Sequence, residues 1–228
     1  MNFLDLVNNV LDEIDEDQLD SATFVTSTDA SIRRAKRYIN SVYRELFFER
    51  QDWSWVREFQ TITTVDGTPA YDLSATTDTE RIHAAFLSNE PPLELIPYEE
   101  YIRKYQETQT DGRGKPFLAT IYNGQLKLYP TPADTYTVNV INSKKFNKLN
   151  AYDDEPYLPD GKRHVLWYGA TWMASLHDRE ADADRWKGLY TKAVQQLRGS
   201  EGNNHKGYAI IPEEETVTSE YYESILLE

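Results

Sequence analysis

The apolar residues of this 228-residue chain change their spacing twice, and this change is the strongest constraint on its fold. They recur at helical spacing between residues 29 and 51, mostly alternate between residues 58 and 141, and return to helical spacing from residue 160. An apolar stripe on a helix has to be buried against another element. We therefore expect an α+β fold, in which helices from both ends of the chain form one bundle and an antiparallel β-rich module is inserted between them.

A long helix is predicted over residues 29–51. Its start can be capped by Ser27, Thr28 or Asp29, because short polar side chains accept hydrogen bonds from the first backbone N–H groups of a helix. Its apolar stripe consists of Ile32, Ala35, Tyr38, Ile39, Val42, Tyr43, Leu46 and Phe47. A shorter amphipathic segment is predicted at residues 3–14.

Two more helices are predicted after residue 160, separated by the polar stretch 177–181. A short connection of this kind is typical of an antiparallel helical hairpin, which would pack against the helix at residues 29–51. The second helix is expected to end near Arg198. Residues 200–207, with the sequence SEGNNHKG, are interpreted as a linker.

The dipeptide Asn123-Gly124 is the clearest local signal in the middle of the chain. It favours a type I′ turn that places Ile121 opposite Leu126 in a hairpin. The apolar face of this hairpin consists of Ala119, Ile121, Leu126 and Leu128, and the polar face of Thr120, Tyr122, Gln125 and Lys127. Further strands are predicted at residues 58–65, 70–73, 81–87 and 136–141, with a turn at Asp66-Gly67 and a short helix at residues 98–106.

These elements predict four parts along the chain. Residues 1–28 form an acidic N-terminal arm that contains the short helix and a polar connector at residues 16–28. Residues 29–55 and 156–198 form the helical bundle domain, around the inserted β-rich module at residues 56–155. Residues 199–228 form an acidic C-terminal tail.

The net charge of −14 is located at the two ends of the chain. Residues 1–32 contain eight acidic residues and no basic one, and residues 207–228 contain six acidic residues and no basic one. The remaining 24 acidic residues (38 − 8 − 6) balance 24 basic residues in the body. This distribution argues against DNA binding through phosphate neutralisation, which needs clustered lysines and arginines.

The C-terminal tail ends in an apolar cluster, and such clusters on terminal segments mark docking sites. We predict that this cluster becomes ordered on a partner; its members are Tyr221, Tyr222, Ile225, Leu226 and Leu227.

A basic cluster lies at the start of the long helix, where positive charge is unfavourable. Its members are Arg33, Arg34, Lys36 and Arg37. One interpretation is a solvated helix face. The other is an electrostatic contact with an acidic partner, either a nucleic acid or an acidic arm of the same or a neighbouring protein.

Trp53 and Trp55 lie at the transition from helix to strand. They form either a stacking platform for sugars or bases, or a clamp that fixes the inserted module to the bundle. We favour the clamp, because a junction between two domains needs a large apolar filler whatever the function.

The sequence contains no recognisable catalytic, cofactor-binding or metal-binding motif. The absence of cysteine excludes thiol catalysis, disulfides and cysteine-ligated zinc. The run Asp153-Asp154-Glu155 lacks the alternating ligand spacing of calcium loops. No apolar run is long enough to cross a bilayer, so we expect no membrane association.

Several short motifs follow one another in an order that resembles the head-to-tail adaptor (connector) proteins of short-tailed bacteriophages, over about residues 29–198. The motifs are Asp52-Trp53-Ser54-Trp55, Gly67-Thr68-Pro69-Ala70-Tyr71-Asp72-Leu73, Gly114-Lys115-Pro116-Phe117, Leu126-Lys127-Leu128-Tyr129-Pro130-Thr131-Pro132-Ala133-Asp134, Leu158-Pro159 and Tyr168-Gly169-Ala170. Residues 1–28 and the C-terminal tail fall outside this resemblance.

The resemblance implies a structural virion protein that is assembled in the host cytoplasm and forms a dodecameric ring with itself. The ring would dock under the portal protein, connect it to the tail nozzle and leave a channel for DNA without binding it specifically. Tail fibre proteins are further partners to consider. The apolar cluster of the tail would then dock on the portal or on an adjacent subunit.

Two other functions stay open from the residues alone. The first is a virion-associated peptidoglycan or glycan hydrolase, with a carboxylate pair near the tryptophans. The second is a nucleic-acid-binding module that uses the basic cluster at the start of the long helix.

Overall fold

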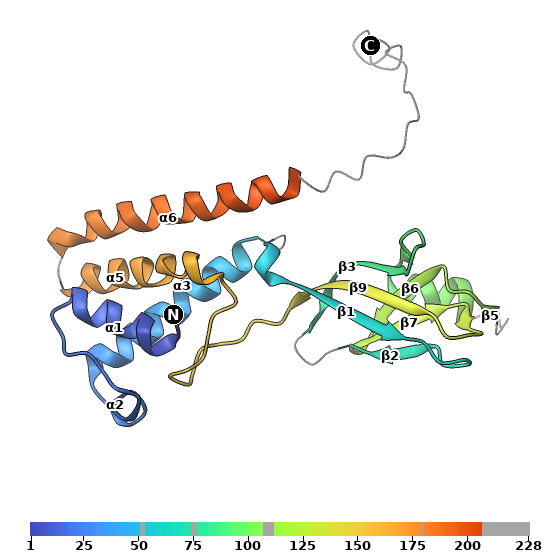
Figure 1. Ribbon diagram of the computed structural model, residues 1–228, viewed down its shortest axis with the longest axis horizontal. Coiled ribbons are helices and arrows are strands. Elements are labelled where there is room, and N and C mark those ends of the chain that lie inside the picture. Colours follow the sequence, from blue (N-terminus) through green and yellow to red (C-terminus); the bar gives the residue numbers. More distant parts are fainter. Residues whose placement is uncertain (51–52, 74–76, 107–111, 179, 207–228) are drawn as a thin grey trace, which may run out of the picture.

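The computed structural model describes residues 1–50, 53–73, 77–106, 112–178 and 180–206. The molecule is elongated, with the helical bundle at one end and the strands, together with the short helix α4 (Tyr98–Tyr101), at the other (Figure 1). Each end has its own apolar core. The predicted α+β class is therefore confirmed.

The helical part contains elements from both ends of the chain. They are α1 (Phe3–Glu13), α2 (Ser21–Thr26), α3 (Ala30–Glu49), α5 (His164–Asp178) and α6 (Glu180–Lys206). Helix α3 packs against α1 and α5, and α6 runs antiparallel along α5 (Figure 1). The predicted bundle and its helical hairpin are thus present.

The start of α3 is capped by Asp29, whose carboxylate accepts a hydrogen bond from the backbone N–H of Ser31 at 2.8 Å. These bonds from Ser31, helped by the positive charges of Arg33 and Arg34, lower the pKa of Asp29. Of the three candidate caps, the structure thus uses the one that carries a negative charge, which is favourable at this end of a helix.

The polar connector predicted at residues 16–28 is not entirely irregular, because it contains the six-residue helix α2. Asp20 and Thr23 form a capping box at its start, and Phe24 packs edge-on against Phe3 with ring centroids 5.3 Å apart. A helix with one buried side chain has no apolar period, which is why hydrophobic patterning misses it.

The linker predicted at residues 200–207 is also wrong, since α6 continues to Lys206. Glu201 is 5% exposed, and its carboxylate accepts a hydrogen bond from the backbone N–H of Ser54 at 2.8 Å. This long-range contact stabilises the last turns of α6 against the low helix propensity of the local glycines and asparagines.

In its described residues, the β-rich part consists of two main sheets and one short strand pair. The first sheet has the order β1-β9-β3, with β1 at Arg57–Thr63, β9 at Thr137–Lys144 and β3 at Thr77–Leu87. The second has the order β2-β7-β6-β4, with β2 at Ala70–Asp72, β7 at Gln125–Tyr129, β6 at Leu118–Tyr122 and β4 at Glu94–Leu95. The pair consists of β5 (Arg113–Gly114) and β8 (Thr131–Pro132).

The module is mixed rather than purely antiparallel, because β4 pairs with β6 and β5 pairs with β8 in parallel orientation. The predicted turn at Asp66-Gly67 is present, with Gly67 at a φ of 75°. The strands on either side of it, β1 and β2, belong to different sheets. Residues of both sheets contribute to one shared apolar core.

The hairpin at Asn123-Gly124 forms in the predicted register, with Ile121 opposite Leu126. Asn123 and Gly124 have φ values of 52° and 79°, as a type I′ turn requires. Its predicted polar face is covered by α4 (Tyr98–Tyr101), which continues as a π-turn over Ile102–Gln106. The Tyr98 ring stacks on Tyr122 of that face at 3.9 Å.

The chain returns from the module to the bundle through residues 145–155, here called the return segment. Phe146 packs on Tyr43 and Phe47 of α3, with centroid distances of 5.2 and 5.3 Å, and Leu149 is buried in the helical core. We assigned these residues to the inserted module, which ended at residue 155 in the prediction. Phe146 and Leu149 of that predicted module pack on the bundle, and all the domain boundaries stay predictions.

Candidate functional site: a basic groove on the helical bundle

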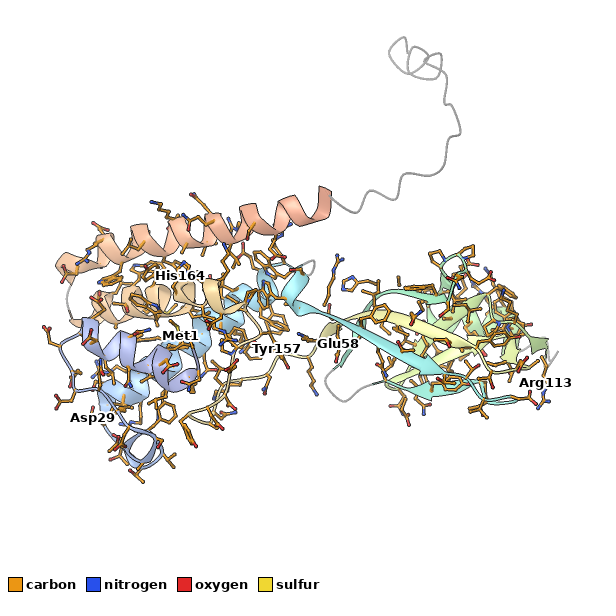
Figure 2. The ribbon with its side chains drawn as sticks, in the orientation of Figure 1. Met1, Asp29, Glu58, Arg113, Tyr157 and His164 are labelled. Atoms are coloured by element: carbon orange, nitrogen blue, oxygen red, sulfur yellow. The ribbon has the colours of Figure 1, made fainter. Side chains whose placement is uncertain are left out.

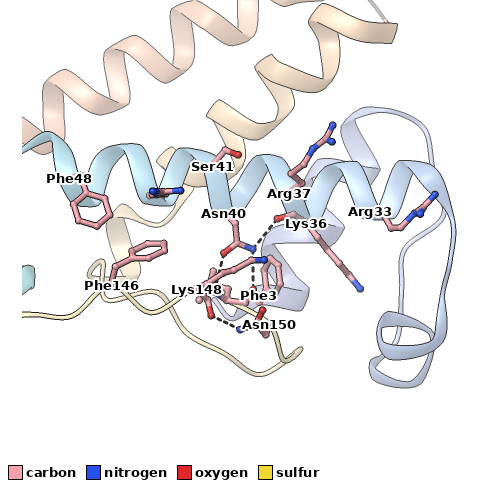
Figure 3. Close-up of a pocket in the computed structure, with 12 residues that line it drawn as sticks. Phe3, Arg33, Lys36, Arg37, Asn40, Ser41, Phe48, Phe146, Lys148 and Asn150 are labelled. Carbon is pink, nitrogen blue, oxygen red and sulfur yellow. Dashed lines mark hydrogen bonds between the residues drawn. The ribbon is translucent and has the colours of Figure 1, made fainter. Parts of the chain in front are cut away.

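A groove of about 730 Å³ lies between α3 and the return segment (Figure 3). It is bordered by Phe3, Arg33, Lys36, Arg37, Asn40, Ser41, Arg44, Phe48, Phe146, Lys148, Leu149 and Asn150. We call it the basic groove, because five of these residues are lysine or arginine and none is acidic.

Asn40 holds the two walls of the basic groove together. Its side-chain amide donates to the backbone carbonyl of Leu149 and its side-chain oxygen accepts from the Leu149 N–H, both at 3.0 Å (Figure 3). Farther along the return segment, the carboxylate of Asp154 accepts bonds from the N–H groups of Asn150 and Ala151 at 2.6 and 2.8 Å. The two bonds between the Asn40 side chain and the Leu149 backbone therefore fix the return segment to α3, and the Asp154 bonds hold the segment's own shape, so the groove exists before any partner binds.

The cations of the groove differ in how far they are already engaged. Arg33, Arg37, Arg44 and Lys148 are exposed, and within the described part of the chain none of the four forms a salt bridge. Lys36 is different: its ammonium group donates to the backbone carbonyl of Phe24 and lies 3.6 Å from the centre of the Phe24 ring. Partial burial lowers the pKa of Lys36. Four positive charges thus remain available to an anionic partner.

The structure brings three of the four predicted basic residues together in the groove, namely Arg33, Lys36 and Arg37. The fourth, Arg34, lies on another side of α3, near Ile14. Arg44 was missed, although it follows Arg37 by seven residues and therefore lies on the same face of the helix.

Lys148 was also missed, because no pattern in the sequence places it beside α3. Only the return of the chain from the β-rich part brings it there.

Trp53 and Trp55 are buried in the helical core, with exposed fractions of 0% and 6%. Their rings stack at 5.7 Å, and the Trp53 indole N–H donates to the backbone carbonyl of Leu46 at 2.8 Å. Burial of this degree leaves no ring face open for a sugar or a base, so the platform interpretation loses its support.

The junction between the two parts lies next to these tryptophans. Figure 2 shows Glu58 at the start of β1 and Tyr157 at the end of the returning chain, both close to the junction. The ammonium group of Lys144 at the end of β9 donates to the backbone carbonyl of Trp55 at 3.3 Å and lies 4.7 Å from the Tyr157 ring centre. The clamp role of the tryptophans stays a prediction.

Two residues of the acidic run at 153–155 have structural partners. Asp154 accepts the two backbone bonds described above, and Glu155 forms a salt bridge with Arg163 at 2.9 Å. Among the described residues, no three histidine, aspartate or glutamate side chains are grouped so that they could hold a metal ion. In the same residues, no helix has the length and apolar character that crossing a membrane requires.

The apolar cluster of the C-terminal tail, from Tyr221 to Leu227, lies outside the described residues.

The comparison with protein families gives a match over almost the whole chain. A family model described as SU10 adaptor protein matches residues 1–209. The chain belongs to this family. The adaptor match includes residues 1–28, which we had placed outside the resemblance. The search of curated proteins found no match for this adaptor.

Membership identifies the chain as a structural adaptor of a phage particle and therefore as a virion component. Adaptors of this kind interact with portal and tail components of the phage.

Proposed function

We propose that this adaptor forms a ring at the head-to-tail junction, docks under the portal protein and connects it to the tail nozzle. The observation that carries the proposal is the family match over residues 1–209. The two separate cores agree with it, because each end of the elongated molecule can present a surface to a different neighbour. In this proposal the ring is a dodecamer, is assembled in the host cytoplasm and leaves a central channel through which DNA passes.

The charge distribution supports a DNA channel without DNA binding. A ring through which DNA slides should not hold the phosphates, and the chain as a whole carries a net charge of −14. The acidic residues of the N-terminal segment 1–28, directed at the channel, would repel DNA and keep it mobile. The basic groove would then face a protein partner instead of the channel.

We further propose that the apolar cluster of the tail, from Tyr221 to Leu227, docks on a partner in the assembled ring. Deleting residues 207–228 should leave the melting temperature of the isolated protein nearly unchanged. The same deletion should abolish attachment to phage heads that carry the portal. Unchanged attachment would contradict this role of the tail.

The proposed ring is tested by mixing the purified protein with purified portal assemblies and imaging the product by cryo-electron microscopy. We expect a closed ring of this protein on one face of the portal, with an open channel on its axis. A full-length protein that leaves the portal bare at micromolar concentration would overturn the proposal. The portal imaged alone serves as the control for density that belongs to the portal itself.

A further inference from the structure

We propose that the basic groove receives the tail segment, residues 207–228, of a neighbouring copy of this chain. The inference rests on the proposed ring, because a ring places identical copies side by side. It adds to that function the surface by which one subunit holds the next.

The charges of the two surfaces are complementary. The groove is bordered by five basic residues and no acidic one, whereas the tail segment has six acidic residues and no basic one. Arg33, Arg37 and Arg44 lie along one face of α3, so they present a row of positive charge. An extended acidic peptide laid along this row would pair its carboxylates with several cations at once.

The apolar parts of the two surfaces also match. Phe48 is 43% exposed, and Phe146 lies beside it with the ring centroids 5.7 Å apart. The tail segment alternates acidic and apolar groups, as in Glu220-Tyr221-Tyr222-Glu223 followed by Ile225-Leu226-Leu227. Aromatic rings next to arginines are typical of the sites where binding energy is concentrated in protein interfaces.

The position of the tail segment favours a neighbouring groove over the groove of its own chain. Helix α6 packs along α5 and also contacts α3 through the salt bridge of Arg198 with Glu49, whereas the return segment borders α3 on the opposite side (Figures 1 and 3). The bond from Ser54 to Glu201 fixes the last turns of α6 near the C-terminal end of α3, on the side away from the return segment. The tail segment therefore starts away from its own groove.

The length of the tail segment is sufficient to reach a second copy. Its 22 residues (228 − 206) span at most about 75 Å when extended. Helix α3, which forms one wall of the groove, has 20 residues and is about 30 Å long. The extended tail segment is thus more than twice as long as the α3 wall of the groove, so part of it can lie along the groove while the rest spans the gap between two subunits.

A nucleic acid would also satisfy the positive charge of the groove. The apolar residues of the tail segment would then have no binding partner in the groove. The two occupants predict different binding, and the first experiment separates them. A fluorescein-labelled peptide of residues 207–228 is titrated with the full-length protein and followed by fluorescence anisotropy. We expect saturable binding that weakens as salt is raised, because ion pairs contribute to it.

The variant Arg37→Glu/Arg44→Glu should weaken peptide binding at least tenfold. Arg103→Glu, an exposed reversal in the β-rich part, is the matched control and should leave it unchanged. A peptide with Glu220→Lys and Glu223→Lys should recover affinity for the groove variant. Binding of a single-stranded oligonucleotide together with no binding of the peptide would overturn the proposal.

The second experiment tests whether the contact is made between subunits. The chain contains no cysteine, so Ser41→Cys in the groove and Ser224→Cys in the tail segment introduce the only thiols. Mixing the two single variants on the portal should give disulfide-linked dimers under mild oxidation. Ser88→Cys, on an exposed turn of the β-rich part, replaces Ser41→Cys in the control. A crosslink that forms only within one chain carrying both cysteines would overturn the neighbour-to-neighbour contact.

The outcomes also separate this inference from the proposed function. If a ring forms on the portal but the Ser41→Cys and Ser224→Cys variants give no crosslink, the proposed adaptor ring is supported and the groove contact is contradicted. If crosslinked dimers form but do not bind the portal, the groove contact is supported and the proposed docking of the ring on the portal is contradicted.

Discussion

The side chain of Asn40 and the backbone of Leu149, which are 109 residues apart, exchange two hydrogen bonds of 3.0 Å. This pair connects α3 to the segment by which the chain returns from the β-rich part. It stabilises the bundle and at the same time holds the wall of the basic groove in place.

Replacing Asn40 with alanine should destabilise the protein by about 1–3 kcal/mol, because the Leu149 N–H and carbonyl lose their partner in a partly buried position. Asn147→Ala is the control, since Asn147 is an exposed residue of the same segment and its loss should cost less than about 0.5 kcal/mol. Urea unfolding of both variants measures the difference. Equal stability of the two variants would contradict the role of this pair.

Gly169 lies where α5 packs tightly against both α3 and α6. A Cβ at this position would lie 2.9 Å from both methyl carbons of Val42 on α3 and 2.9 Å from the Tyr190 ring on α6. Gly169→Ala should therefore cost about 1–3 kcal/mol of stability through overpacking. Gly188→Ala on α6, where nothing lies within 4 Å, should be neutral or stabilise by up to about 1 kcal/mol. Thermal unfolding of the two variants distinguishes them, and a stabilised Gly169→Ala protein would refute the close packing.

Trp53 and Trp55 should contribute strongly to stability. Trp53→Ala removes a fully buried ring and its bond to Leu46, so we expect a loss of about 3–5 kcal/mol, and Trp55→Ala should approach that range. Phe59→Ala, which removes a ring that is 62% exposed, is the control and should cost much less. If both tryptophan variants lost under about 1 kcal/mol, the clamp role would have no energetic basis.

The helical bundle should lose stability in alkaline solution. Burial, with a smaller contribution from the charges of Glu45 and Glu49, raises the pKa of Tyr190 to about 12, and burial also raises the pKa of Tyr43. The folded state thus keeps these phenols protonated above about pH 10, where they ionise in the unfolded chain. This contribution is complete below pH 10 and is lost as the pH rises towards 12.

The urea midpoint should accordingly fall between pH 9 and pH 11, and Tyr190→Phe should make that fall less steep. A midpoint whose slope with pH is the same in both proteins would show that Tyr190 does not contribute.

The isolated protein should be largely monomeric at moderate salt and should form its ring only on the portal. The proposed contact between the tail segment and the basic groove depends on ion pairs that salt weakens, so we expect it to hold subunits together only when the portal places them side by side. Charge reversal at Arg33 and Arg37 should impair assembly on the portal without unfolding the monomer, which circular dichroism checks. Sedimentation velocity gives the direct measurement, and a stable closed ring without the portal would refute template-dependent assembly.

The elements that could be predicted are those whose signal is local. The hairpin register follows from the Asn123-Gly124 turn and the alternation around it, and the start of α3 follows from a capping residue next to an apolar stripe. Helix α2 and the last turns of α6 were missed because their stability comes from Phe3 and Ser54, which are distant along the chain. The parallel pairing of β4 with β6 was also missed, because it joins two short segments that are not consecutive strands of a hairpin and has no local sequence signal.

For the basic groove too, some features could be predicted from the sequence and others could not. The sequence by itself determined that Arg33, Lys36 and Arg37 share the start of a helix, that the acidic residues in excess lie at the ends of the chain, and that the bundle draws on both ends, because each of these depends only on order and spacing. Only the tertiary structure decided that Phe146 and Lys148 would face α3, since that contact is made by Asn40 across 109 residues. It also decided that Trp53 and Trp55 are buried, because the free energy of covering two large rings depends on which neighbours the fold supplies.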